Sequence, residues 1–358
     1  MNLLFLTPRY FPHLGGVEYV VKSVAERLVK KGHDVTVLCG EWSIDNPKEE
    51  WINGVHVYRW PVWAPEDAYH IPWKRGNLKK WLMNAVREFD VIHLHGLHSV
   101  LTVYSLNALE NYGIHKVLTP HYHGTGHTAF RRLLWLAWRD YVRSALNSVS
   151  VIHTVSDMES KLIFNDFDVR STTIGHGVEE WLSEIDWIPS NYVMYSGRIE
   201  RYKNVQRLAN IVKILNDMGL NLELKIFGSG PYTSELASHL NRIKLRFEMM
   251  PPQPYNKYIM YLSRASLSGL LSEKEAYGLT INEANAIGVP VVAVEPWGLS
   301  FSGRRRTLIT QLDKSDEALA KEIAVFLDEA RKQPKSKVPS WNQIVDVYLK
   351  KLYYQKLN

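Results

Sequence analysis

Short apolar runs that predict β-strands alternate with amphipathic helical patterns along most of this 358-residue chain. The first two runs, Asn2–Leu6 and Asp34–Leu38, enclose a helical pattern over Val17–Lys31 that ends at Gly32. Alternation of this kind indicates parallel sheets whose two faces are covered by helices. We therefore expect an α/β protein that begins with a Rossmann-like domain.

The alternation falls into two series, which predict two domains. The first continues with strands at Val91–Leu94, Lys116–Thr119 and Val149–Thr154, and with helices at Leu101–Asn111 and Asp157–Phe164. The second contains strands at Tyr192–Tyr195, Leu222–Phe227, Leu245–Met249, Ala265–Leu271 and Val291–Val294. Because the pattern changes near Gly177–Ser190, we expect one domain over residues 1–180 and another over 181–340, followed by a helix over Trp341–Tyr354.

Composition limits the classes of protein to which the chain can belong. With 46% hydrophobic and 22% charged residues, it can form two ordinary cores. Its single cysteine, Cys39, excludes an intrachain disulfide and a cysteine zinc cluster. No run approaches the roughly 18 apolar residues of a membrane span, and the N-terminus lacks the basic region of a signal peptide. We therefore expect a cytoplasmic protein.

Two glutamates, Glu275 and Glu283, flank a turn at which a helix begins. The turn, Ala276 to Thr280, offers backbone N–H groups at the positive end of the helix dipole, where a diphosphate would find unpaired donors. Glu275 can accept hydrogen bonds from sugar hydroxyls, and Glu283, about two helical turns further on, can reach a ribose. The arrangement predicts a phosphorylated-sugar site, and the alternative is two solvated glutamates that stabilise the dipole.

Two further segments predict contacts with phosphate. Gly15 and Gly16 join the first strand to the first helix and let backbone approach an anion closely, unless they only form a flexible turn. Their loop lacks the G-x-G-x-x-G pattern of NAD enzymes. After the strand that ends at Gly197, Arg198 and Lys203 could neutralise a departing diphosphate, and the alternative for this pair is a solvated face.

The sequence EAYGLTINE from Glu275 to Glu283, followed by GVPVV from Gly288, resembles the motif of glycosyltransferase family 4, the glycosyl transferases group 1. The resemblance runs from Met1 to about Gly298. It implies the GT-B fold, in which two Rossmann-like domains with parallel sheets face each other across a deep cleft. It also implies that the C-terminal helix, residues 341–358, returns to the first domain.

The resemblance implies a retaining hexosyltransferase that takes its sugar from a nucleoside-diphosphate sugar and needs no metal or other cofactor. Arg198 and Lys203 would stabilise the leaving diphosphate, and Glu275 would orient the sugar. His121 would contact the sugar near the reacting carbon, and His95 would line the acceptor cleft. The donor would contact Gly15, Gly16, Gly197, Gly228, Gly230, Tyr277, Gly278, Leu279, Thr280 and Glu283, the last through its ribose.

Histidines raise the alternative of a metal-dependent hydrolase. Six of the 14 lie in two short stretches: His93, His95, His98, His121, His123 and His127. A His-x-His pair on a strand can bind zinc, but catalytic sites usually add carboxylates, and only Asp90 is near. We expect no metal, and we expect His93 and His123 to be strand ends satisfied by backbone hydrogen bonds. The Asp-x-Asp string Asp166–Asp168 is expected to be a solvated turn after a helix.

Two basic and aromatic stretches bear on the acceptor: Phe130–Ala145, FRRLLWLAWRDYVRSA, and Trp73–Trp81, WKRGNLKKW. Together with the net charge of +6, they favour an anionic partner, either nucleotide phosphates or a membrane surface, here the inner face. We expect a glycan or lipid-linked acceptor, and no nucleic acid, because no binding module is recognised. The alternatives are arginines in water on a helix packed against the sheet, and a non-catalytic sugar-nucleotide-binding protein.

The chain departs from the family pattern at three places. Ala276 stands where glycine is common, and Glu295–Gly298 replaces a glycine pair. The segment SFSGRRRTL, residues 300–308, has no family counterpart. Its arginines, Arg304–Arg306, are expected to form either an anion site or a solvated loop.

Overall fold

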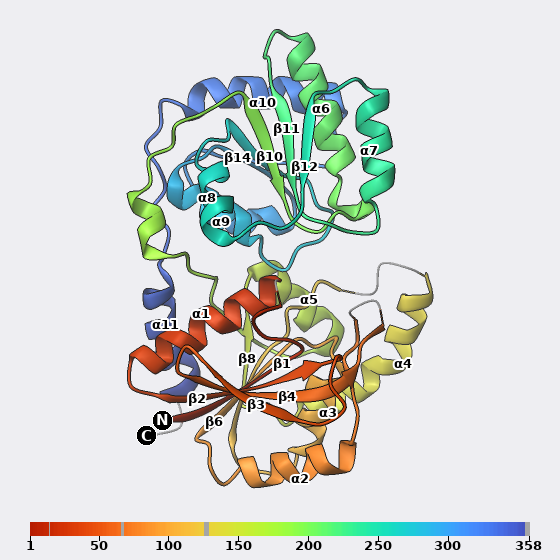
Figure 1. Cartoon of the computed structure of the whole chain (residues 1–358), viewed down its shortest axis with the longest axis vertical. Helices are drawn as coiled ribbons and strands as arrows, with labels where there is room; N and C mark the ends of the chain where they lie inside the picture. Colours follow the sequence, from red (N-terminus) through yellow and green to blue (C-terminus); the bar gives the residue numbers. More distant parts are fainter. Residues whose placement is uncertain (14, 66–67, 125–128, 355–358) are drawn as a thin grey trace. The chain divides into compact units, whose positions relative to one another are not determined.

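The computed structural model describes residues 1–13, 15–65, 68–124 and 129–354. The chain divides into two compact units (Figure 1). We call Met1–His176, joined by the segment from Trp341 onward, the N-terminal unit, and Gly177–Ser340 the C-terminal unit. Each contains a largely parallel sheet with helices, which confirms the predicted α/β class.

The N-terminal unit is built on a sheet of strand order β3-β4-β2-β1-β6-β7-β8-β9. The parallel strands are β1 (Asn2–Thr7), β2 (Asp34–Glu41), β4 (Val55–Trp63), β6 (Val91–His95), β7 (His115–Thr119), β8 (Val151–Thr154) and β9 (Thr172–Thr173). Two strands run antiparallel to β4: β3 (Lys48–Ile52) and β5 (Ile71–Pro72).

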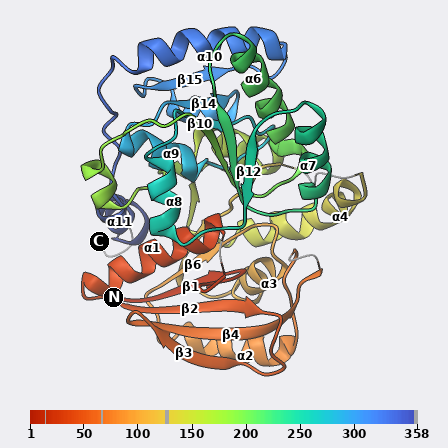
Figure 2. The same cartoon turned by 45° about the horizontal axis from the view of Figure 1, so that its top comes forward.

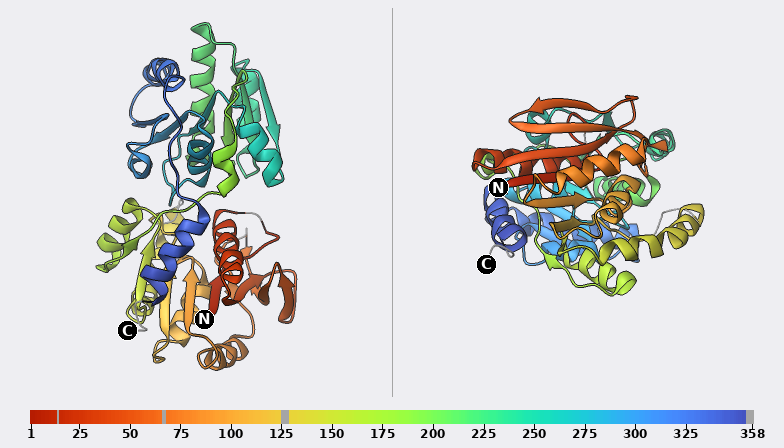
Figure 3. Two further views of the ribbon diagram at one scale, coloured as in Figure 1. Left: turned by 90° about the vertical axis from the view of Figure 1, so that its left-hand side faces the viewer. Right: turned by 90° about the horizontal axis from the view of Figure 1, so that it is seen from below.

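Alternate residues of β1 serve opposite faces of this sheet, as the period of a strand requires. Its helices are α1 (Gly16–Lys30), α2 (Arg75–Ala85), α3 (Val100–Ala108), α4 (Ala129–Leu146), α5 (Asp157–Phe167) and α11 (Trp341–Tyr348), which continues into the π-helical η5 (Leu349–Tyr353). Leu4 and Leu6 pack with α2, α3, α4 and α5. Phe5 contacts the His93 ring on the other face, 5.2 Å away. On that face α11 lies beside α1 (Figure 3). The rings of Tyr19 and Trp341 meet edge-on between these two helices.

The C-terminal unit has a sheet of order β12-β11-β10-β13-β14-β15 in which all neighbours pair in parallel. The strands are β10 (Tyr192–Ser196), β11 (Glu223–Phe227), β12 (Phe247–Met250), β13 (Leu267–Leu270), β14 (Val291–Val294) and β15 (Thr307–Thr310). The α-helices are α6 (Val205–Asp217), α7 (Thr233–Arg242), α8 (Tyr255–Leu262), α9 (Leu279–Ile287) and α10 (Asp316–Ala330), of which α6 and α10 pack together (Figure 2). Short 3₁₀ turns are η2 (Glu180–Glu184), η3 (Arg201–Lys203) and η4 (Trp297–Phe301).

Strand order locates the crevice where each sheet can bind a ligand. All these strands run parallel, but the order in which they are added changes side between β1 and β6 in one sheet and between β10 and β13 in the other. Loops that follow such neighbouring strands diverge to opposite sides, so ligands of open α/β sheets bind at this switch point. The loop after β1 leads to Gly15 and His95 is the last residue of β6, whereas the loops after β10 and β13 lead to Lys203 and Glu275.

Two features of the N-terminal unit differ from the sequence analysis. The expectation of a solvated turn over Asp166–Asp168 is wrong for Asp166, which lies within α5 and accepts a hydrogen bond from the Tyr122 hydroxyl, whereas Asp168 is exposed directly after the helix. The β3–β4 hairpin was missed, although its Asn53-Gly54 turn carries the left-handed φ angles, 50° and 83°, that this dipeptide favours.

Candidate active site

Lys203 and Glu275 form an ion pair at the switch point of the C-terminal unit. Lys203 ends η3, which follows β10, and Glu275 lies in the loop after β13. The lysine Nζ donates to Glu275 Oε1 over 2.6 Å, and the two side chains are only 12% and 16% exposed. The Asn204 amide ties the same two loops together by donating to the Leu271 carbonyl over 3.1 Å. The structure thus brings together two predicted residues that are far apart in the sequence.

The surroundings of Lys203 keep its ammonium charged. Burial alone would lower its pKa, but the Glu275 carboxylate and the Tyr202 hydroxyl more than offset that effect, so the pKa lies above its ordinary value. The ammonium also lies 5.0 Å from the centre of the Tyr202 ring, a favourable cation–π distance. A partly buried cation of this kind acts strongly on nearby negative charge.

Arg198 is held much more loosely than Lys203. Its side chain is 68% exposed and pairs with Glu200 over 3.1 Å. The Tyr195 hydroxyl donates to the Arg198 carbonyl over 2.7 Å, which fixes the backbone of the loop while leaving the guanidinium in solvent. The guanidinium can therefore change partners at little cost.

The predicted glycines of this unit allow two backbone segments to touch. A Cβ atom on Gly228 would lie 1.9 Å from the Gly197 carbonyl oxygen, and one on Gly230 would lie 2.2 Å from that of Ile199. Backbone hydrogen bonds from Gly197 to Phe227 and from Ile199 to Ser229 join the same segments. Close packing of the loops after β10 and β11 is thus a sufficient reason for these glycines.

Residues of the segment that departs from the family pattern pack against the turn before α9. Gly278 caps α9 with a left-handed φ of 106°, and a Cβ there would lie 3.1 Å from Trp297. The Trp297 indole donates to the Ser272 carbonyl over 2.7 Å. Tyr277 packs edge-on against Phe301. Leu279 and Thr280, the first residues of α9, stay partly exposed, and N–H groups at this position have no acceptor within the helix.

Two of the three neighbouring arginines brace α9. Arg304 donates to the side-chain oxygens of Asn282 and Asn285, and Arg306 donates to the carbonyls of Gly288 and Gln333. The expectation of an anion site or a solvated loop is therefore wrong for Arg304 and Arg306.

Glu283 is buried, with only 6% of its surface exposed. Its two oxygens accept hydrogen bonds from the hydroxyls of Tyr255, over 2.9 Å, and Tyr258, over 2.8 Å. Burial raises its pKa to about 7, although both tyrosines oppose the shift. Any ribose that reaches Glu283 must add to these bonds or replace one of them. Trp181 packs edge-on against Tyr255 and, with Ile185 and Met260, lines a hollow of about 470 Å³.

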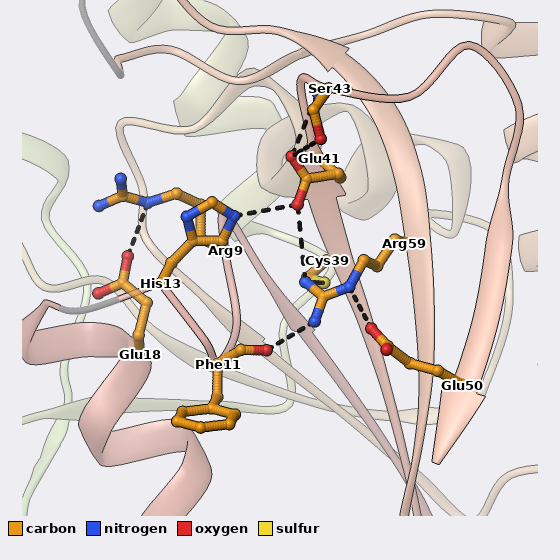
Figure 4. A network of polar contacts seen from close by, with 9 residues as sticks. All are labelled: Arg9, Phe11, His13, Glu18, Cys39, Glu41, Ser43, Glu50 and Arg59. Carbon is orange, nitrogen blue, oxygen red and sulfur yellow. Dashed lines mark hydrogen bonds and ion pairs between the residues drawn. The ribbon is translucent and has the colours of Figure 1, made fainter. Parts of the chain in front are cut away.

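The carboxylate of Glu18, in the first turn of α1, lies next to the glycine loop of the N-terminal unit. A Cβ on Gly15 would lie 2.2 Å from the Glu18 carboxylate, so a larger residue there would require that side chain to move. Arg9 donates to the same carboxylate over 2.8 Å (Figure 4). Gly15 and Gly16 are exposed at the start of α1, where the helix dipole favours an anion.

Buried polar contacts brace this loop from the sheet, as Figure 4 shows. Arg59 of β4 donates to the Phe11 carbonyl over 2.6 Å and pairs with Glu50. Its guanidinium also lies 3.8 Å from Glu41, whose other contacts include His13 at 3.0 Å. Nothing in the local sequence predicted Arg59, because its partners come from separate strands and a loop.

His121 and His95 form an imidazole pair at the switch point of the N-terminal unit. The His121 Nε2 and His95 Nδ1 atoms are 3.1 Å apart. His121 has a left-handed φ of 48°, a conformation that is uncommon for non-glycine residues. Burial and the nearby His153 lower the pKa of His121 to about 3. His95 is 1% exposed, so a substrate would meet His121 before His95.

A chain of hydrogen bonds next to this pair links His153, Thr119, His93 and Tyr353. The direction of donation along it follows from the Ile174 carbonyl at one end, which can only accept. His153 must donate from Nε2 to the Ile174 carbonyl, so its Nδ1 accepts from the Thr119 hydroxyl. That hydroxyl accepts from His93 Nε2, whose Nδ1 accepts from Tyr353. The expectation of backbone partners for His93 is wrong, because both ring nitrogens bond to hydroxyl groups. These directions hold because both imidazoles are neutral: burial lowers the pKa of His153 to about 4 and that of His93 well below 6.5.

Glu159 holds the backbone next to His121. Its carboxylate accepts from the N–H groups of Tyr122, over 2.6 Å, and Val155, over 2.7 Å. Ser156 caps the helix by accepting from the Glu159 N–H, as the sequence predicted.

We expect Glu159→Ala to lower the free energy of unfolding by about 2 kcal/mol or more, because two buried N–H groups lose their acceptor. Asp157→Ala, an exposed first-turn change on the same helix, is the control and should cost less than about 0.5 kcal/mol. Urea unfolding and the amide exchange rate of Tyr122 measure the effect. Equal stability of the two variants would contradict the assignment.

The described residues contain neither a metal-binding cluster nor a membrane-spanning helix. In the described ranges, no group of three or more His, Cys, Asp and Glu side chains could hold a metal ion, and His127 lies outside those ranges. No helix in the described part of the chain combines the length and the apolar character needed to cross a bilayer. In α4, Trp135 is buried against His98 and Tyr122, and the side chains of residues 129–134 are not among those described.

Comparisons with known proteins show the family of the chain. The chain matches the family models Glycosyltransferase Family 4 over residues 14–180 and Glycosyl transferases group 1 over residues 187–337. The phosphatidylinositol N-acetylglucosaminyltransferase GPI3 subunit of Saccharomyces cerevisiae is 20% identical over 318 residues, which cover 83% of this chain and 69% of the yeast protein.

Solved structures share the fold. Sucrose-phosphate synthase from Thermosynechococcus elongatus superposes with a TM-score of 0.72 at 17% identity, covering 99% of this chain and 95% of the synthase. HepE from Anabaena, solved in complex with UDP and glucose, gives a TM-score of 0.67 at 15% identity, with coverage of 99% and 95%. These likenesses show the GT-B fold with two Rossmann-like domains.

Proposed function

This chain belongs to glycosyltransferase family 4 and is a glycosyltransferase, and we propose that it is a retaining, metal-independent hexosyltransferase that uses a nucleoside-diphosphate sugar. The observation that carries the proposal is the Lys203–Glu275 pair, 2.6 Å apart at the switch point of the C-terminal unit. One charged group there suits a diphosphate and the other suits sugar hydroxyls.

In the proposed reaction, the bond between the anomeric carbon and the diphosphate oxygen breaks, and the sugar passes to an acceptor hydroxyl that releases its proton. Negative charge grows on the departing diphosphate. Lys203 has three donors, so it can bind the diphosphate while it keeps Glu275 in place. Arg198 adds a second cation, and the exposed N–H groups at the start of α9 add neutral donors. Glu275 then orients the sugar hydroxyls.

Glu283, His121, Gly15 and Gly16 keep their proposed roles, whereas His95, predicted to line the acceptor cleft, is 1% exposed and is proposed instead to orient His121. Glu283 binds the ribose together with the two tyrosines that hold it. In the N-terminal unit, His121 contacts the sugar near the reacting carbon as a neutral donor, with His95 setting its orientation from behind. Gly15 and Gly16 add anion-binding backbone at the start of α1.

The acceptor is proposed to be a lipid-linked glycan or another lipid with a free hydroxyl. The yeast relative is named as a phosphatidylinositol N-acetylglucosaminyltransferase, which supports a lipid acceptor. The net charge of +6 also favours an anionic surface. The donor class is supported by the Anabaena structure, which holds UDP and glucose.

A screen of UDP-, GDP- and ADP-sugars in the presence of EDTA tests the proposal. We expect one donor to raise the melting temperature and to release its nucleoside diphosphate slowly, faster when a membrane lipid extract supplies an acceptor. Turnover that EDTA abolishes would overturn metal independence and revive the hydrolase alternative. A donor that binds but is never cleaved would favour the non-catalytic binding protein.

A further inference from the structure

Exposed tryptophans gather near the end of β4 in the N-terminal unit. Trp63 ends this strand and is 54% exposed, Trp73 follows β5 and is 59% exposed, and Trp42 follows β2 and is 63% exposed. Indole side chains usually bury most of their surface, and exposed large aromatic groups mark contact surfaces.

The strand register places Trp63 and Trp73 on one face. Trp63 lies opposite Ile71 in the β4–β5 pair, and Val62 lies opposite Pro72. The Trp73 N–H continues the ladder by donating to the Pro61 carbonyl over 2.9 Å. Because opposite residues share a face and alternate residues return to it, the two indoles are diagonal neighbours on the same side of the hairpin.

Basic residues follow Trp73 directly in the chain, at the start of α2. Lys74, Arg75 and Lys79 are exposed, and Lys79 follows Arg75 by one helical turn on the same side of the helix. From Ala68 to Ala85 the sequence contains basic residues and no acidic one. Lys74 also donates to Asn46, in the loop that contains Trp42. We call Trp42, Trp63, Trp73, Lys74, Arg75 and Lys79 the tryptophan–lysine surface.

We propose that the tryptophan–lysine surface binds an anionic lipid membrane. Indoles favour the headgroup level of a bilayer, and lysine and arginine are attracted to anionic lipids beside them. A second copy of the chain would bring like charges together, which disfavours self-association through this face. The inference deepens the proposed function, on which its biological purpose rests, because a lipid-linked acceptor lies at such a surface.

The sequence suggested two basic and aromatic stretches as membrane contacts, Phe130–Ala145 and Trp73–Trp81. In the first, Trp135 of α4 is 5% exposed and packs in the core. The second contains Trp73, Lys74, Arg75 and Lys79 of the tryptophan–lysine surface, to which the structure adds Trp42 and Trp63.

Flotation of the full chain with phosphatidylcholine vesicles, with and without phosphatidylglycerol, tests the proposal. We expect binding that needs phosphatidylglycerol and weakens with salt. Trp63→Ala combined with Trp73→Ala should reduce the partition coefficient about tenfold or more, because two interfacial indoles are lost. Lys74→Gln and Lys79→Gln should each reduce it about fivefold.

Trp51→Ala is the matched control, because Trp51 is 71% exposed on β3 and lies outside the surface. Equal loss in this variant and in the Trp63/Trp73 variant, or equal binding to vesicles without phosphatidylglycerol, would overturn the proposal. Dimerisation that the same substitutions abolish would also overturn it, in favour of a second copy. Lys203→Ala should bind vesicles like the unmodified chain, so loss of transfer and loss of docking can be told apart.

Discussion

Lys203→Ala should slow sugar transfer by about 10²-fold or more, because the departing diphosphate loses a preorganised cation. The Glu275 carboxylate also loses the ammonium that binds it at 2.6 Å. The variant therefore removes a cation and also leaves Glu275 without the contact that positions it. We expect the loss in kcat more than in KM, since the negative charge grows only as the bond breaks. Initial rates with the donor found in the EDTA screen measure the effect.

Lys225→Ala is a closely matched control. Lys225 lies on β11, pairs with Glu223 and Glu248, and is 14% exposed against 12% for Lys203. It should leave transfer nearly unchanged, and thermal unfolding should show that both variants are folded. Transfer near the unmodified rate in Lys203→Ala, or an equal loss in the control, would remove Lys203 from the reaction.

Acidification should unfold the N-terminal unit before the C-terminal unit. Among the 14 histidines, His239 alone lies in the C-terminal unit. Burial lowers the pKa of His153 from 6.5 to about 4, and it lowers those of His93, His95 and His176 well below 6.5. Between these lowered pKa values and 6.5, the histidines bind protons in the unfolded chain but not in the folded unit. The stability that the neutral histidines contribute is fully present above pH 6.5. This contribution is lost as the pH falls towards 4, by up to about 1.4 kcal/mol per histidine and pH unit.

Two buried carboxyl groups act in the opposite direction. Burial raises the pKa of Glu159 to about 8 and that of Glu283 to about 7. Each gains stability as the pH falls through its folded value towards its unfolded value of 4.5. In the N-terminal unit, Glu159 offsets only part of the effect of several histidines, whereas Glu283 stabilises the C-terminal unit over the same range. The difference in stability between the two units should therefore increase as the pH falls.

Calorimetry between pH 7.5 and pH 4.5 measures this contrast as two transitions that separate. His153→Asn should flatten the pH dependence of the first transition, and His239→Gln, in the C-terminal unit, is the control. A single transition at every pH, or earlier loss of the C-terminal unit, would contradict the prediction.

Local pattern was sufficient for the central strands and for several caps. Val91–Leu94 and Tyr192–Tyr195 are apolar runs that match β6 and β10 closely, and Ser156 caps α5 as predicted. The charged edge strand Lys48–Ile52 was missed because it carries too few apolar residues to show a period. The same limit applies to β15, which lies in the segment without a family counterpart.

The types of side chain that carry the proposed chemistry could be recognised one by one in the sequence, since each follows a strand or begins a helix. The contacts between these side chains could not be predicted in the same way. Lys203 meets Glu275, 72 residues away, only because β13 pairs beside β10 and both loops leave the same edge of the sheet. In the same way, Glu283 meets two tyrosines of α8, and the loop of His121 meets Glu159 of α5. Periodicity and capping act over a few residues, so composition and order suffice for them, whereas partners across a sheet depend on strand order, which no short stretch of sequence encodes.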